Sequence, residues 1–542
     1  MGPLALEGVV GSLSEIERVC GDVRNWIGVG AAGEGVLRGS WNRRIEEEEE
    51  EAHRQNNEGD GDIESDGDDN GDGDVDDDDD GGGTGDEEAP LLASDIHTVI
   101  LLDRSCDFVT PLTTPLTYEG LIDFVWKGGI RNGYVKVDEL VVGGEAESEN
   151  KKSAESFNKS TEKSTDKATT KSTNKKIPVS LNSTDPLFAL LRNQNIETTG
   201  PFLAKQAQLI RESYSNFREN KSAKTIGEIH AFVKDLPGLT KNYQSLTQHI
   251  HIAEVVKKVT SSPEFREGWM RERGMLEGEA DFDRLEDLIS TRPPLWDVLR
   301  LLTLQSLTSN GIKSGRYDTI KREIVQQYGF ESVEKIGVLE AMGAIRRKEN
   351  LNFGSGVGDK DGEGGATGGN WSSLRTRMSL INDSVNISDP DDIAFVTSGY
   401  APLSVRFIQA IVREETTFGT TFAGPGNKPS KGGLKTLVKV VRVTNDKSGG
   451  RNGPPTFEEV LERTKEEGSI DVSPPTKGGQ ETETQESKPV LLAYYVGGIT
   501  YAEIAALRYL SALPATKFPF QIVIATTYVI NGEKLIRSLV DC

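Results

Sequence analysis

The chain has 542 residues but little cysteine, little histidine and no long uninterrupted apolar run. Its three cysteines, Cys20, Cys106 and Cys542, are too few and too scattered for a disulfide framework or a structural zinc site. This usage predicts a reducing, cytosolic compartment, and the first residues show no pattern that would lead us to expect a secretory signal. The most apolar stretch, residues 490–513, contains two charged residues and two adjacent glycines. We therefore expect a buried strand and helix there, not a membrane span.

The sequence also lacks the excess of basic residues that nucleic-acid binding requires. It has 62 Lys and Arg against 86 Asp and Glu, a formal net charge of -24. Between Glu46 and Glu88 lie 23 acidic residues and one basic residue, so the remainder of the chain sums to -2. We expect a near-neutral globular protein that carries one acidic, self-repelling tract.

Three short apolar runs are typical of strands buried on both faces of a sheet. They cover residues 98–102, 490–496 and 521–526. Gly497 and Gly498 follow the second run, and Thr500 with Glu503 forms a capping box that begins a helix over 501–510. Strand, glycine turn, helix and strand predict a βαβ unit and a parallel sheet.

Residues 201–347 have helical periodicity almost throughout. Pro237 and Gly238 separate two of the expected helices, over 225–236 and 246–259, and predict a hairpin with its turn at this dipeptide. The fold class is therefore α/β, a parallel-sheet α/β domain interrupted by a large all-helical insertion domain, with several disordered inserts. The expected segments are an opening helix and turn (1–45), an acidic disordered insert (46–95), the continuing α/β domain (96–144), a disordered Ser/Thr/Lys insert (145–178), the helical domain (179–350), a Gly-rich loop and linker (351–390), and the second α/β half (391–422 and 490–542) around a low-complexity insert (423–489).

Several short patterns resemble ligand sites but lack the context that the chemistry needs. Gly28, Gly30 and Gly33 have dinucleotide-loop spacing, yet a helix-like stretch rather than a strand is expected before them, which favours a plain turn. The calcium-loop pattern at 66–77 has polyacidic flanks in place of helices. His249 and His251 stand two residues apart and do not share a helix face. No metal or cofactor is expected.

A catalytic role rests on two features only. Asp103 ends the first strand, where α/β enzymes place functional groups, and Gly497-Gly498 before a helix could hold an anion. An α/β nucleotide- or phosphate-binding enzyme is thus one alternative, and an acidic chaperone or calcium buffer is another. An internal ion pair at Asp103-Arg104 and a tight βα turn at the glycines are the simpler interpretations, and no catalytic residue is assigned.

A series of longer strings, in order along the chain, resembles one known family. The strings are LLDRSCDFVTPL at 101–112, LTYEGLID at 116–123, KTIGEIHAFVKDLP at 224–237, SLTQHIHIAE at 245–254, PLWDVLRLLTLQSL at 294–307, YDTIKRE at 317–323, SGYAPL at 398–403, GGITYAEIAALR at 497–508 and ATTYVING at 525–532. They are similar to the SM (Sec/Munc-like) family, cytosolic regulators of SNARE-mediated membrane fusion.

The resemblance implies a three-domain arch of which the N-terminal domain is expected to be lacking here. It implies a non-enzymatic template on which SNARE helices align, with Leu236, Pro237 and Gly238 at the hairpin turn that binds them. The implied partners are syntaxin-like and R-SNAREs, and a tether subunit of a HOPS/CORVET-like complex that docks on residues 293–342 and the C-terminal α/β half. The implied location is cytoplasmic, peripheral on late-endosome or vacuole membranes through these partners.

Overall fold

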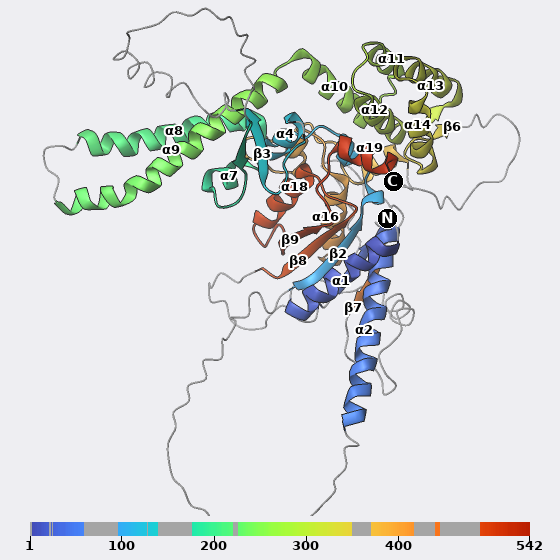
Figure 1. The fold of residues 1–542 in the computed structure, drawn as a ribbon, viewed down its shortest axis with the longest axis horizontal. Helices are drawn as coiled ribbons and strands as arrows, with labels where there is room; N and C mark the ends of the chain where they lie inside the picture. The colour runs from blue at the N-terminus through green and yellow to red at the C-terminus, as the bar shows by residue number, and fades with distance from the viewer. Residues whose placement is uncertain are drawn as a thin grey trace, which may run out of the picture.

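The computed structural model describes most of the chain outside its low-complexity segments. The described residues are 3–20, 23, 25–58, 96–126, 128–138, 176–219, 226–348, 370–416, 440–444 and 488–541. They form an α/β body, a long helical hairpin and a compact helical block (Figure 1).

A five-stranded sheet lies at the centre of the body, in the order β7-β1-β2-β8-β9. Its strands are β1 (Asn25–Val29), β2 (Ile96–Asp103), β7 (Val440–Thr444), β8 (Val490–Val496) and β9 (Gln521–Thr526). Four strands run parallel, and β7 pairs antiparallel with β1 at one edge. The three strands expected from the sequence are present, and β8 and β9 have the expected bounds. The expected burial on both faces is wrong for β9, because this strand lies at the edge of the sheet and its residues are half-buried or exposed.

Successive side chains of the buried strands enter two different cores, as the period of two requires. Trp26, Val99 and Leu101 pack under α1 (Pro3–Cys20) and α2 (Gly30–Glu58). The alternate residues belong to the largest core, which continues into the helical elements on the other face. The helical elements of the body there are η1 (Arg104–Cys106), α3 (Val109–Leu112), η3 (Ile393–Thr397), α16 (Leu403–Thr416) and α18 (Tyr501–Ala512). The expected capping box of α18 is present.

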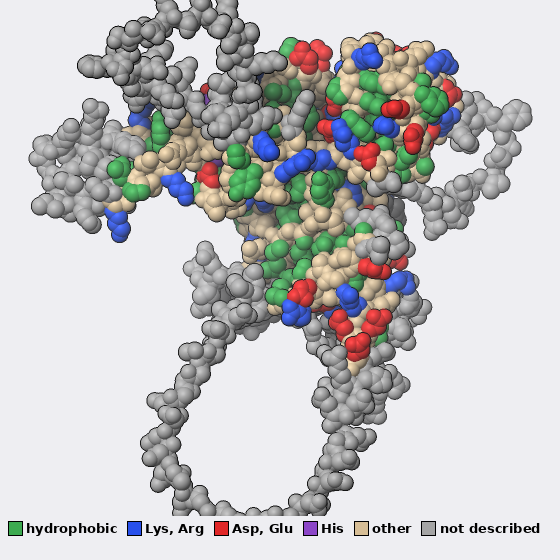
Figure 2. Space-filling model, viewed as in Figure 1, with side chains coloured by type: hydrophobic (Ala, Val, Ile, Leu, Met, Phe, Trp, Pro, Cys, Tyr) green, Lys and Arg blue, Asp and Glu red, His purple; other side chains and the backbone are tan. Residues whose placement is uncertain are grey.

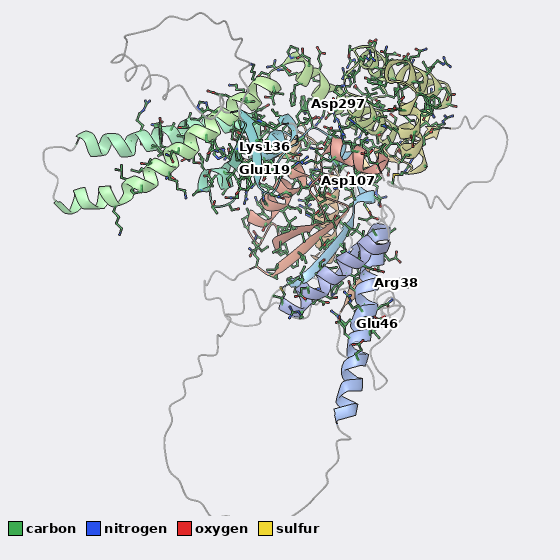
Figure 3. The ribbon with its side chains drawn as sticks, in the orientation of Figure 1. Arg38, Glu46, Asp107, Glu119, Lys136 and Asp297 are labelled. Carbon is green, nitrogen blue, oxygen red and sulfur yellow. The ribbon has the colours of Figure 1, made fainter. Side chains whose placement is uncertain are left out.

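The hairpin consists of α8 (Ile196–Glu219) and α9 (Ile226–Thr260), which lie side by side and project from the body (Figure 1). Its base packs on α4 (Tyr118–Val125), α7 (Pro186–Leu191) and a two-stranded sheet of β3 (Tyr134–Asp138) and β4 (Lys176–Ser180). The ion pair of Glu119 with Arg508, 2.8 Å apart, ties this base to α18 (Glu119 is labelled in Figure 3).

The helical block follows the hairpin in sequence, and the C-terminal helix α19 (Gly532–Val540) packs on it. Its other elements are α10 (Pro263–Glu277), α11 (Phe282–Ser290), α12 (Leu295–Thr308), β5 (Ile312–Lys313), α13 (Ser314–Tyr328), α14 (Glu331–Ala341), β6 (Arg347–Lys348) and α15 (Trp371–Arg377). Figure 2 shows hydrophobic side chains at its surface between charged ones.

The predicted hairpin turn at Pro237 is wrong. Pro237 and Gly238 lie inside α9, which runs unbroken from Ile226 to Thr260. An interior proline removes one backbone hydrogen bond, and residues 236–238 around it are exposed. The Thr240 hydroxyl donates to the Leu236 carbonyl, one turn back along α9, at 3.0 Å. The free energy gained when α9 packs on α8 and on the base exceeds the local cost of the proline.

Three expected boundaries also need correction. Gly28 lies in a strand, β1, and a helix begins at Gly30, contrary to our expectation of a helix immediately before the glycines. That helix continues through the start of the acidic tract to Glu58, because glutamate is a good helix former. Strands β4 and β7 lie partly or wholly within the expected inserts 145–178 and 423–489. The calcium-loop pattern and residues 59–95 fall outside the described residues.

Candidate functional site

The N-terminus of α2, where a dinucleotide would bind in an α/β enzyme, contacts the carboxylate of Asp103. One oxygen of Asp103 accepts a hydrogen bond from the Ala32 amide and the other from the Ser105 amide, both at 2.9 Å. A Cβ atom on Gly30 would lie 2.8 Å from the Asp103 Cβ, so glycine permits this close approach. A side chain of the protein thus takes the place of an anionic ligand.

The Gly497-Gly498 turn has a packing role as well. A Cβ on Gly497 would meet the Arg104 Cβ at 2.7 Å, and one on Gly498 would meet Ile530 at 2.7 Å. Both glycines have positive φ, at 98° and 105°. The following helix begins with the Thr500–Glu503 capping box. The turn is therefore a tight βα connection that leaves no space for a ligand over the glycines.

Arg104 lies at the centre of a buried ionic cluster, with Glu503 at 2.9 Å and Asp107 at 3.4 Å. Burial alone would lower the pKa of Arg104, but the two carboxylates outweigh it and raise that pKa. Burial raises the pKa of Asp107, against the effect of Arg104. Glu503 also accepts a hydrogen bond from Ser404 on α16. The expected internal ion pair exists, but Arg104 pairs with Glu503 and Asp107 instead of Asp103 (Asp107 is labelled in Figure 3).

A large cavity in the body lies apart from the features on which the enzyme interpretation rests. A cavity of about 1200 Å³ lies beside α16 and the end of α18, and its lining includes Arg406, Tyr509 and Phe518 but neither Asp103 nor the glycine pair. No three His, Cys, Asp or Glu side chains in the described part of the chain are grouped as a metal site would require. Within the same residues, no helix combines the length and apolarity needed to cross a bilayer. Asp103 and the glycine pair, on which the enzyme interpretation rests, thus have structural contacts within the chain.

The hairpin is the remaining candidate. Leu236, Pro237 and Gly238 lie together on the projecting part of α9, and all three are exposed, with Leu236 at 37%. Tyr243, two turns further along, is exposed too. The three residues are thus placed on an accessible helix surface, although not at a turn. An exposed helical surface with apolar side chains can bind another helix.

The base of the hairpin contains a polar junction that the sequence did not reveal. His249, fully buried, contacts the carboxylate of Asp185 through Nε2 at 3.1 Å and the hydroxyl of Tyr118 through Nδ1 at 3.0 Å. Asp185 also accepts a hydrogen bond from Ser245 and caps α7. One sequence signal could have indicated that His249 is buried, namely its helical spacing from Leu246 and from the apolar residues that follow. His251, by contrast, is partly exposed beside Glu254.

We expect the charge of Asp185 to make part of the protein's stability depend on pH. Burial opposes the charge, but hydrogen bonds from His249 and Ser245 lower the pKa of Asp185 from 3.8 to about 2. A lowered pKa stabilises the fold above the ordinary value, and this contribution is lost as the pH falls towards about 2. In Asp185→Asn the amide still caps α7 but carries no charge. The difference in free energy of unfolding between wild type and variant should narrow from about pH 5 to pH 2, and a constant difference would contradict this assignment.

An α/β body that is interrupted by helices and carries a projecting hairpin fits the SM class, which the strings in the sequence resemble. Residues 84–538 match the Sec1 family, so the chain belongs to that family. It is 31% identical over 450 residues to the vacuolar protein-sorting-associated protein 33 homolog of Arabidopsis thaliana, covering 82% of this chain and 62% of that protein. Vacuolar protein sorting-associated protein 33A of Rattus norvegicus is 33% identical over 449 residues, with the same coverage. The chain spans 62% of the length of these two relatives.

Solved structures show the same fold at low sequence identity. Sly1p, crystallised with an N-terminal peptide of Sed5p, superposes with a TM-score of 0.53 at 11% identity, covering 99% of this chain and 67% of that one. Unc18 from the Unc18–syntaxin 1 complex of Monosiga brevicollis gives 0.51 at 14% identity, covering 99% and 71%. These likenesses confirm the α/β fold with its helical insertion.

Proposed function

We propose that the chain is an SM-type regulator of SNARE-mediated vesicle docking and fusion, which binds SNARE helices along the α8–α9 hairpin. The observation that carries the proposal is that hairpin. In a chain of the Sec1 family, it projects from the body and presents exposed residues on α9, while its buried residues gather at the base. A rigid helical surface of this kind can hold amphipathic partner helices in one register. Syntaxin-like and R-SNAREs are the proposed partners.

The finer part of the proposal is membership of a HOPS/CORVET-like tethering complex, acting peripherally at late-endosome or vacuole membranes. The names of the relatives, which are vacuolar protein-sorting proteins, support it. Residues 293–342, where the tether subunit is proposed to dock, include Phe330, whose side chain is 81% exposed. This is the largest exposed fraction among the large apolar side chains of the described residues. Exposed aromatic side chains of this kind often anchor protein interfaces.

Replacing Pro237 with alanine tests the hairpin. Alanine restores the backbone donor and favours a straighter α9, which would move the distal surface against a bound SNARE helix. We expect several-fold weaker binding of a syntaxin-like SNARE-motif peptide to Pro237→Ala, measured by titration calorimetry. Gly268→Ala is the control, because it adds a helix-favouring alanine on α10, outside the hairpin, where a Cβ meets nothing within 4 Å. An unchanged affinity in Pro237→Ala would remove residues 236–238 from the proposed site.

A thermal-shift screen against nucleotides separates the fusion regulator from the rival enzyme. Binding of SNARE peptides and of the tether subunit, with no stabilisation by nucleotides, is the expected result. A clear stabilisation by a nucleotide would contradict the proposal.

A further inference from the structure

The buried face of α9 contains one polar residue among apolar ones. Leu246, His249, Ile252 and Val256 are all less than 5% exposed and recur at helical spacing. Burial of a polar ring costs free energy unless its nitrogens are hydrogen-bonded. An apolar residue at position 249 would fill the same place without this requirement. The histidine therefore supplies something other than burial.

Both ring nitrogens of His249 have partners on different elements. Because the carboxylate of Asp185 can only accept, Nε2 carries the hydrogen and donates to it. In the neutral ring, Nδ1 then accepts from the hydroxyl of Tyr118. The ring of Phe188 stacks on the imidazole at 5.8 Å, nearly parallel, and that of Tyr118 meets it edge-on at 5.9 Å. The two hydrogen bonds and the two ring contacts together hold the imidazole in one orientation.

These contacts join three elements at one point. Tyr118 belongs to α4, Asp185 is the N-cap of α7, and His249 lies in α9. Ser245, one turn before His249, donates to the same carboxylate. Side chains of α9 that can be described before Ser245 are exposed or only partly buried. The hairpin is therefore attached at its base, and its distal end lies about 35 Å along the helix axis from His249.

Because the hairpin is long and attached only at its base, a small rotation at the base moves its outer end by a large distance. Apolar contacts such as those of Leu246 and Ile252 resist separation but permit sliding and rotation, whereas hydrogen bonds lose strength steeply when their angle changes. The hydrogen bonds of the polar junction therefore restrain the orientation of the hairpin more strongly than the apolar contacts of the base do.

We propose that His249 is a positioning residue that, with Tyr118 and Asp185, holds the hairpin at one orientation to the α/β body. This inference rests on the proposed function, because the fixed orientation is what presents the distal surface of α9 to a SNARE helix. His249 itself does not touch the partner. Its role is to reduce the range of hairpin directions, so that less conformational freedom is lost when a partner binds.

Spin labels measure the hairpin direction independently of any partner. One label is placed at Lys234→Cys, an exposed position about 22 Å along α9 from His249, and the other at Lys517→Cys, on the body, after the native cysteines are replaced by alanine. In His249→Leu and Tyr118→Phe the distance distribution between the labels should broaden relative to wild type. Ile252→Leu, which changes the same buried face without removing a hydrogen bond, should leave it unchanged. His249→Gln keeps an amide donor for Asp185 and should restore part of the narrow distribution.

Binding is measured on the same variants with a syntaxin-like SNARE-motif peptide. Loss of one or both hydrogen bonds should weaken the affinity by about fivefold, while binding of the tether subunit at the helical block stays unchanged. Tyr118→Phe removes a single hydroxyl and keeps the inference testable if His249→Leu does not fold. An unchanged distance distribution in Tyr118→Phe and His249→Leu would overturn the inference. If wild type binds no SNARE peptide, the proposed function fails, and the distance measurement still decides whether His249 positions the hairpin.

Discussion

Glu503→Ala is expected to lower the free energy of unfolding by about 3–5 kcal/mol, because it leaves the buried guanidinium of Arg104 without its main counter-charge. Glu503 is fully buried and contacts Arg104 at 2.9 Å, the Thr500 amide at 2.8 Å and the Ser404 hydroxyl. Its removal also opens the capping box of α18. The measurement is urea unfolding followed by circular dichroism.

Glu533→Ala is the matched control for this substitution. Glu533 also lies in the first turn of a helix and pairs with an arginine, Arg537, but both side chains are about half exposed. Exposed pairs contribute about 0–1 kcal/mol, so this variant should stay close to wild type. Equal losses of unfolding free energy in Glu503→Ala and Glu533→Ala would show that the Arg104 cluster does not stabilise the body as described.

Phe330→Asp is expected to weaken binding of the tether subunit by more than about 30-fold, since a buried aromatic anchor at an interface contributes about 2 kcal/mol or more. Phe330 lies between α13 and α14, and its exposed ring makes little contribution to packing within the chain. The substitution should therefore leave the unfolding free energy nearly unchanged. The affinity is measured by biolayer interferometry with the purified tether subunit.

Met270→Asp serves as the control for an exposed apolar side chain outside residues 293–342. Met270 is 65% exposed on α10, and its replacement should leave tether binding unchanged. SNARE-peptide binding should be unaffected in both variants, because α14 and the hairpin belong to different parts of the molecule (Figure 1). Wild-type tether affinity in Phe330→Asp would exclude this side chain from the docking surface.

Local sequence patterns were sufficient for elements whose signals are confined to a few residues. The continuous apolar runs of β8 and β9 and the capping box at Thr500 and Glu503 were all recognisable without the structure. Strand β1 was missed because its Asn-Trp-Ile-Gly-Val sequence has no clear strand pattern and follows directly on a helical segment. Its burial comes from neighbours far along the chain, β2 and β7.

The position of the hairpin turn shows where a local rule fails. A proline with a glycine predicts a break, but α9 continues through Pro237 because α8 and the base hold both halves of the helix in line. The cost of a proline in a helix is a few kcal/mol, which packing of a long helix can exceed. The SNARE-binding role of residues 236–238 remains a prediction.

The sequence by itself determined that the body is near neutral, where three of the five strands of the central sheet lie, and which family the chain resembles. Only the tertiary structure decided which groups form hydrogen bonds and ion pairs with the buried polar side chains. Asp103 caps a helix 71 residues earlier, Arg104 pairs with Glu503 across 399 residues, and His249 bonds Tyr118 across 131. Such pairs form because burial makes an unpaired charge or polar group costly, and the nearest available partner in space is set by the fold and not by distance along the chain.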